Sequence, residues 1–295
     1  MLVTDHLGTR QAAPGARRGA VSKTYLPVNV LAGFMDDSHF RAFAQEYLAT
    51  LPEVEQAALL ANVEKARAFV SELGPHENFA TEIRPIDLAQ RFATHEHFQA
   101  AFGTLPIRFS WIRPEHVVAV QAFVNSQEEE VPTTEVELID FALPVSSEVP
   151  VEISFIPPLG PIYLVSSSPH FAGLGIRMAD NRQVIIEPPP HLNLIQVVQL
   201  DGRYYLRNGY HRVVGALKAG VPELPALVVD ANQPPDVELP QLGVASFSVL
   251  RYVMSLPRPP LVADFGSAAT VAIRMRERRY GASVSLTISP LNIGV

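Results

Sequence analysis

The chain has 295 residues, of which 47% are hydrophobic and 18% are charged, and its 30 acidic residues outnumber its 23 basic ones to give a formal net charge of −7. This composition supplies enough apolar side chains for a buried core and argues against general disorder. The absence of cysteine excludes disulfides, thiolate nucleophiles, iron–sulfur clusters and thiolate zinc sites. The acidic balance disfavours binding to duplex nucleic acid, which depends on Lys and Arg at the phosphates.

Neither a membrane span nor a secretory signal is predicted. The longest nearly apolar stretches, such as 117–124, are far shorter than the ~20 residues that a membrane-spanning helix needs. Residues 1–6 lack the basic and apolar regions of a signal peptide. We therefore expect a cytoplasmic protein that does not enter a membrane.

The N-terminal part predicts an arm followed by helices. Residues 1–27 are rich in Gly, Ala, Pro and Arg, a composition typical of a mobile or extended arm. Apolar residues at spacings of three and four predict a helix from Ser38, its expected N-cap, to residue 51. A second helix should run to Leu73, where Gly74 and Pro75 supply a stop.

Two further helices complete this expected unit. The third should begin near Asp87 and end at Gly103, and the fourth should begin at Pro114 and carry Val117, Val120 and Val124 on one side. Residues 28–130 are accordingly predicted to form a mainly helical unit.

Beyond residue 130 the pattern changes to short β-branched stretches separated by prolines, which is typical of a sheet with many turns. A helix is expected over 211–219, ended by Gly220. We assign 131–232 to a mixed β-sheet domain with short helices, so the predicted fold class is α+β. The expected strands are 136–141, 151–156, 162–165, 184–187, 194–200, 204–207 and 226–230.

Residues 233–295 are predicted to form a C-terminal extension. It opens with the proline-rich connector 233–235 and should contain a helix near 244–255. Strands are expected near 269–275 and 283–288.

The most informative segment is the predicted strand–turn–helix that contains Asn208, Gly209, Tyr210, His211 and Arg212. A helix N-terminus presents N–H groups and a partial positive charge to an anion. Glycine permits close backbone approach, and an arginine in the first turn can donate two parallel hydrogen bonds to a phosphate. The segment therefore predicts a phosphate-binding turn.

This segment resembles the ParB/sulfiredoxin-like superfamily. Members of the group place a strand before G-x-x-R or G-x-H-R at a helix start, then a short helix, a glycine and a final strand led by Val and Pro. The chain shows Gly209-x-His211-Arg212, then Gly220-Val221, then 224–229, which begins Leu-Pro. The resemblance covers roughly residues 150–230.

The resemblance implies a bound nucleoside triphosphate, ATP or CTP with Mg²⁺, at this turn. It favours an NTPase or a phosphotransferase in which Asn208 to Arg212 contact the nucleotide and His211 assists catalysis. Sulfiredoxin chemistry is excluded, because it needs a catalytic cysteine where Tyr210 stands. A chromosome-partition clamp is disfavoured, because 231–295 contains neither a Glu-Asn-x-x-Arg segment nor a helix-turn-helix pattern.

Each of these residues also has a purely structural interpretation. Arg212 could pair with a nearby carboxylate, His211 could bond to a backbone carbonyl, and Asn208-Gly209 could be an ordinary tight turn. The hydroxyl- and glycine-rich loop that contains Ser167, Ser168 and His170 is a candidate second wall of the pocket, or a plain surface loop.

No metal site is predicted, because the histidines lack the close spacing of metal ligands. The strongest basic cluster comprises Arg274, Arg276, Arg278 and Arg279, which could bind nucleic acid or an acidic partner, or could simply balance charge. Three functions thus remain open. They are a nucleotide-dependent enzyme, a non-catalytic nucleotide sensor or scaffold that binds a protein partner through the helical unit, and a metal-dependent DNase.

Overall fold

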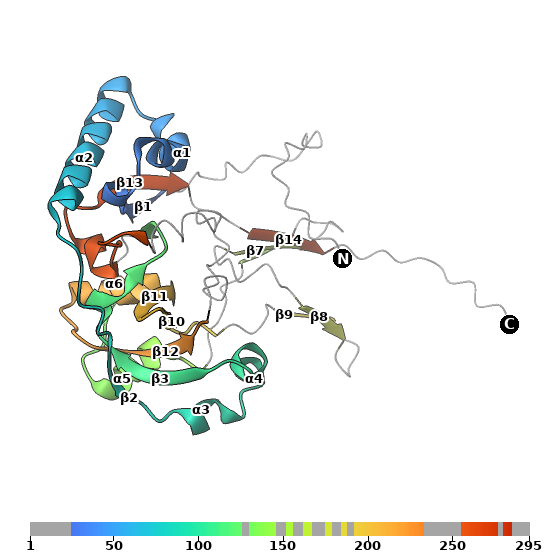
Figure 1. The fold of residues 1–295 in the computed structure, drawn as a ribbon. Coiled ribbons are helices and arrows are strands. Elements are labelled where there is room, and N and C mark those ends of the chain that lie inside the picture. The colour runs from blue at the N-terminus through green and yellow to red at the C-terminus, as the bar shows by residue number, and fades with distance from the viewer. Residues whose placement is uncertain are drawn as a thin grey trace.

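A mixed six-stranded sheet forms the centre of the larger hydrophobic core (Figure 1). Strands β10 (Gln196–Leu200) and β12 (Leu224–Asp230) are parallel, as are β11 (Arg203–Asn208) and β4 (Val118–Ala119), while the other neighbours are antiparallel. The computed structural model describes residues 25–125, 130–145, 152–155, 162–166, 175–178, 184–187, 192–232, 255–276 and 280–284. Across the sheet the strand order is β2 (Glu82–Pro85), β3 (Ile107–Ile112), β12 (Leu224–Asp230), β10 (Gln196–Leu200), β11 (Arg203–Asn208) and β4 (Val118–Ala119).

A second core lies at the other end of the molecule in Figure 1, where helices α1 and α2 cover a three-stranded antiparallel sheet. Buried side chains alternate along its strands, because one face packs on the helices. The elements are β13 (Val271–Arg276), β1 (Tyr25–Val30) and β5 (Phe123–Asn125) in the sheet, with α1 (Asp37–Leu48) and α2 (Glu53–Glu72) as the cover.

Four shorter helices surround the six-stranded sheet. Helix α5 (Glu135–Ala142) packs against β12, and α6 (Tyr210–Lys218) packs against the short 3-10 helix Val262–Gly266. Helices α3 (Ala89–Ala93) and α4 (Glu96–Phe102) follow β2. Two small antiparallel sheets complete the described residues. They are β14 (Tyr280–Val284) with β7 (Ile162–Ser166) and β6 (Glu152–Phe155), and β8 (Gly175–Met178) with β9 (Val184–Glu187).

The α+β fold class is confirmed, and most expected elements are present. The helix expected over 38–51, the second helix expected to run to Leu73 and the helix after Gly209 are observed as α1, α2 and α6. The N-cap of α1 is Asp36 rather than Ser38, because the Asp36 carboxylate accepts a hydrogen bond from the His39 N–H at 2.8 Å. The single helix expected near 87–103 is divided into α3 and α4, since His95 caps the start of α4.

The helix expected from Pro114 is wrong. Only a single 3-10 turn forms there, followed by the strands β4 and β5. Val117, Val120 and Val124 are all buried. Their spacing of three and four residues therefore does not mark one face of a helix here. Backbone pairing of β4 with β11, and of Val117 with Val262, takes the place of helical hydrogen bonds.

The strand expected over 136–141 is also wrong, because this stretch is helix α5. Thr134 Oγ1 accepts a hydrogen bond from the Glu137 N–H at 3.4 Å, and Glu137 accepts one from the Thr134 hydroxyl at 2.7 Å. Thr and Glu three residues apart are typical of a helix start. Leu138 and Ala142 are buried one turn apart on the same side of this helix. The β-branched residues of the stretch conceal this helical spacing in the sequence.

The boundary expected near residue 130 does not separate two structural units. Strands β3 and β4 come from the segment expected to be helical, yet they pair with β12 and β11 of the expected sheet domain. Strand β13 of the expected C-terminal extension pairs with β1, which includes residues 25–27 of the expected arm. The rest of that arm, residues 1–24, and the helix expected near 244–255, apart from Ser255, lie outside the described residues.

Within the described ranges, no helix combines the length and the hydropathy that crossing a bilayer would require.

The loop before β2 is held by His76. Its backbone N–H donates to the Pro257 carbonyl at 3.2 Å, and its ring packs edge-on against Phe79 with ring centroids 4.8 Å apart. The His116 ring lies 5.6 Å away, centroid to centroid. The His76 Nε2 atom is buried and has no hydrogen-bond partner among the described residues.

This environment disfavours the protonated form of His76. Burial lowers the pKa of His76, and the positive charge of Arg258 and the neighbouring His116 lower it further, whereas a hydrogen bond with the Asn78 backbone and the Asp264 carboxylate act in the opposite direction. Arg258 donates to that carboxylate at 2.8 Å. The imidazole is therefore neutral in the folded protein at pH 7.

The free energy of unfolding should therefore fall as the pH drops from 7.5 to 5.5. The lowered pKa of His76 means that the unfolded chain binds more protons in this range, so the contribution of His76 is complete above pH 6.5 and is lost below it. Urea titrations across this range should show a smaller loss for His76→Gln than for wild type. The exposed His97 provides the control His97→Gln, and equal slopes for all three proteins would contradict the prediction.

Candidate functional site

The turn between β11 and α6 has the backbone geometry expected from its glycine. Gly209 adopts φ +93°, in the left-handed region that glycine tolerates best. A Cβ at this position would lie 2.8 Å from Cγ1 of Ile195, so the absence of a side chain also permits close packing on the segment that leads into β10. Gly209 is thus required by conformation and by packing together.

The side chains on either side of Gly209 are used for internal contacts. Asn208 Nδ2 donates to the Leu194 carbonyl at 2.9 Å. Tyr210 is 4% exposed, and its hydroxyl donates to the Leu206 carbonyl at 2.8 Å. The same hydroxyl accepts hydrogen bonds from the backbone N–H groups at positions 120 and 121. These contacts fix the start of α6 against β4 and the core, and burial raises the pKa of the Tyr210 hydroxyl.

The Arg212 guanidinium is buried and binds the protein's own carbonyl groups. It donates to the Phe141 and Ala142 carbonyls at 2.7 and 3.3 Å. It also donates to the carbonyl and the side-chain Oδ1 of Asn193 at 2.6 and 2.9 Å. Phe141 and Ala142 end helix α5, where the carbonyl groups carry partial negative charge and favour a cation.

This geometry differs from both sequence-based interpretations of Arg212. The guanidinium is buried and directed at backbone carbonyl groups, and it joins α6 to α5 and to Asn193. The carbonyl groups of Phe141 and Ala142 belong to helix α5, which the strand propensity of 136–141 conceals in the sequence. Arg212 is therefore a positioning residue for the turn.

His211 is the one residue of the turn whose side chain is exposed. It lies in the first turn of α6, which has no acidic residue and no side-chain N-cap. The surrounding protein displaces water from part of the ring and lowers the pKa of His211, and the charge of Arg212 lowers it further. At pH 7 the turn therefore offers a neutral imidazole beside the N–H groups of a helix start, which have no intrahelical acceptor.

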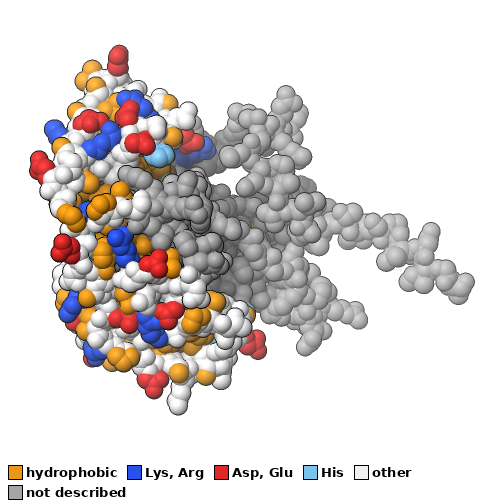
Figure 2. Space-filling view, in the orientation of Figure 1, with side chains coloured by type: hydrophobic (Ala, Val, Ile, Leu, Met, Phe, Trp, Pro, Cys, Tyr) orange, Lys and Arg blue, Asp and Glu red, His pale blue; other side chains and the backbone are white. Residues whose placement is uncertain are grey.

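Several other predicted residues cannot be placed at this turn. Ser167, Ser168 and His170 lie outside the described residues, as do Arg278 and Arg279. Arg274 and Arg276 are exposed on β13, in the three-stranded sheet rather than beside α6. On the face shown in Figure 2, described basic and acidic side chains are interspersed, which does not resemble a basic stripe for duplex binding.

The described residues contain no group of three or more His, Asp or Glu side chains that could hold a metal ion.

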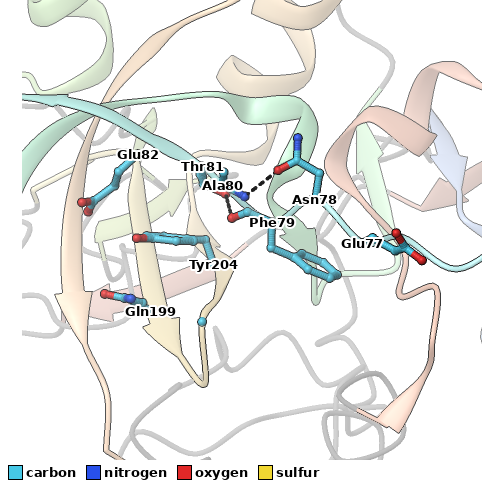
Figure 3. Close-up of a pocket in the computed structure, with 9 residues that line it drawn as sticks. Glu77, Asn78, Phe79, Ala80, Thr81, Glu82, Gln199 and Tyr204 are labelled. Atoms are coloured by element: carbon cyan, nitrogen blue, oxygen red, sulfur yellow. Dashed lines mark hydrogen bonds between the residues drawn. The ribbon is translucent and has the colours of Figure 1, made fainter.

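A cleft of about 510 Å³ lies at the opposite end of β11 from the turn (Figure 3). It is lined by the loop 77–82 on one side and by Gln199, Gly202 and Tyr204 of the β10–β11 hairpin on the other. The sequence gives no sign of this cleft, because its two walls are far apart in the chain and neither contains a recognisable motif. Only the sheet topology brings them together.

Comparison of the chain with protein-family models, with curated proteins and with solved structures finds no match.

The buried role of Arg212 predicts a large effect on stability. Arg212→Ala removes the donors to the carbonyls of Phe141, Ala142 and Asn193, and urea denaturation should show a loss of about 3 kcal/mol. Arg212→Lys should restore only part of this, since an ammonium cannot reproduce the planar set of donors.

The matched control is Arg41→Ala, because Arg41 pairs with Asp37 on the exposed side of α1. Its effect should stay within about 0.5 kcal/mol. A stability of Arg212→Ala equal to that of Arg41→Ala would show that the buried contacts contribute little.

Proposed function

We propose that the protein binds a nucleoside triphosphate at the turn Gly209–Arg212 and belongs to the ParB/sulfiredoxin-like superfamily. The observation that carries the proposal is the start of α6, a helix N-terminus without a side-chain cap and without an acidic first turn, beside an exposed His211. Anions bind favourably at such helix starts. The order of β11, glycine turn, α6, Gly220 and β12 is also the order that the resemblance implies.

The proposed roles of the turn residues follow from their contacts. Backbone N–H groups at the start of α6 donate hydrogen bonds to a phosphate group of the ligand, and the His211 imidazole donates one more. Arg212 does not contact the ligand in this proposal. Its guanidinium binds Asn193 and the end of α5, which positions the turn, and it adds positive charge nearby. Mg²⁺ would accompany the triphosphate and neutralise part of its charge.

His211 is also the proposed catalytic residue of an NTPase or phosphotransferase. Its lowered pKa leaves the imidazole neutral at pH 7, which allows it to accept a proton from an attacking water or hydroxyl group. A non-catalytic nucleotide sensor would bind the same ligand without turnover.

The binding proposal is tested by a thermal-shift panel of ATP, CTP, GTP and ADP with and without Mg²⁺, followed by calorimetric titration of any nucleotide that stabilises the protein. Ligand at 100 times its Kd adds about 2.7 kcal/mol to stability. His211→Ala should weaken binding about tenfold, since it removes one charge-assisted hydrogen bond.

The control His97→Ala removes an exposed histidine from α4 and should bind like wild type. The absence of a shift with every nucleotide, or equal Kd values for His211→Ala and His97→Ala, would contradict the proposal. Phosphate release then separates the enzyme from the sensor, because only the enzyme shows turnover that His211→Ala abolishes.

A further inference from the structure

We propose that the cleft between the loop 77–82 and the β10–β11 hairpin binds a guanidinium group, presented by an arginine-like small molecule or an arginine side chain of a peptide. The cleft lies at the far end of β11 from the nucleotide turn, and the proposal does not depend on nucleotide binding. Three features of its walls support a flat organic cation. They are an excess of negative charge, two aromatic rings, and amide groups that can orient the ligand.

The negative charge comes from carboxylates that share too few cations. Arg108 donates to Glu82 at 2.7 Å and to Asp230 at 2.5 Å, so one guanidinium serves two carboxylates. Glu82 and the neighbouring Asp230, which is not itself part of the lining, thus share one guanidinium, and this group keeps one net negative charge. Glu77 adds a further carboxylate to the lining, while Arg203 adds one further cation.

Tyr204 lies among the same charged groups. Tyr204 is 8% exposed and forms part of the lining. Burial raises the pKa of its hydroxyl and the negative charges of Glu82 and Asp230 raise it further, whereas the charge and the hydrogen bond of Arg108 lower it. Figure 3 shows the Tyr204 hydroxyl directed toward the end of the cleft where Glu82 and Gln199 lie.

The aromatic rings provide flat surfaces of the kind that guanidinium groups stack on. The protein already uses Phe79 in this way, since the Arg203 guanidinium lies 4.7 Å from the centroid of its ring. Contact with His76 holds the same ring from another side. Tyr204 supplies a second ring in the cleft, near the carboxylate of Glu82 (Figure 3).

The amide side chains are oriented so that their NH₂ groups are available. Gln199 Oε1 accepts a hydrogen bond from Arg108 at 2.7 Å, and Asn78 Oδ1 accepts one from the Ala80 N–H at 3.0 Å. Each amide can therefore donate to a carbonyl or carboxylate oxygen of the ligand. A volume of about 510 Å³ is within the range of small-molecule sites and exceeds what one side chain fills.

The direct test is calorimetric titration of the full chain with Nα-acetyl-arginine amide and with its uncharged isostere Nα-acetyl-citrulline amide. The arginine compound should bind about tenfold more tightly, because the isostere lacks the charge but keeps the shape. A tripeptide with a central arginine, titrated in parallel, distinguishes the two sources. Tighter binding of the tripeptide indicates a peptide ligand, and equal binding indicates a small molecule.

Variants locate the site. Glu77→Gln removes an exposed carboxylate of the lining and should weaken binding of the arginine compound about threefold without affecting folding. Glu82→Gln should weaken binding of the arginine compound further. The thermal unfolding midpoint of this variant reports whether the other contacts of Arg108 are kept. Glu72→Gln, at the exposed end of α2, should leave binding unchanged.

The proposal is overturned by equal binding of the arginine and citrulline compounds, by no binding of either, or by undiminished binding in Glu77→Gln. Because the turn Gly209–Arg212 is not part of the cleft, His211→Ala should bind the arginine compound like wild type. Loss of guanidinium binding in that variant would likewise contradict the location.

Discussion

The buried guanidinium of Arg212 determines how the parts around the turn between β11 and α6 fit together. It joins the first turn of α6 to the last carbonyl groups of α5 and to Asn193, just before β10. A single cation on α6 thus satisfies acceptors from two other segments, the end of α5 and Asn193. Because unpaired buried carbonyl groups are costly, these segments are stable together and should loosen together.

The two ends of β11 present opposite electrostatic character. At its C-terminal end, Gly209 begins a helix whose N–H groups and neighbouring Arg212 favour an anion. At its start, Glu77 and Glu82 line a cleft with aromatic walls, which favours a cation. A six-residue strand separates the two regions by about 17 Å. One strand therefore supports two proposed sites that do not compete for the same ligand.

The sequence predicts elements well where one local signal dominates. Helix α2 has Pro52 before it and Gly74 and Pro75 after it, and α6 has glycines on both sides. The errors occur where tertiary pairing overrides local pattern. The buried valines at 117–124 have the spacing of a helical face, but β4 pairs with β11 instead. Residues 136–141 have the composition of a strand, but the Thr134 side chain caps a helix there.

The site shows the same division. Gly209 and His211 can be identified from the sequence, because a glycine turn before a helix is a local property. The role of Arg212 cannot be identified from the sequence, because the carbonyl groups that accept its hydrogen bonds belong to α5 and to Asn193. The cleft is hidden for a related reason, since Glu82 and Tyr204 become neighbours only through the sheet order.

The most direct test of this coupling is native-state hydrogen exchange of wild type and Arg212→Ala, resolved by segment. The account predicts that the amides of α5, the segment 193–195 and the first turn of α6 lose protection together, while those of α1 and α2, which belong to the other core, keep theirs. A uniform loss across both cores, or unchanged protection in α5, would contradict the central role assigned to Arg212.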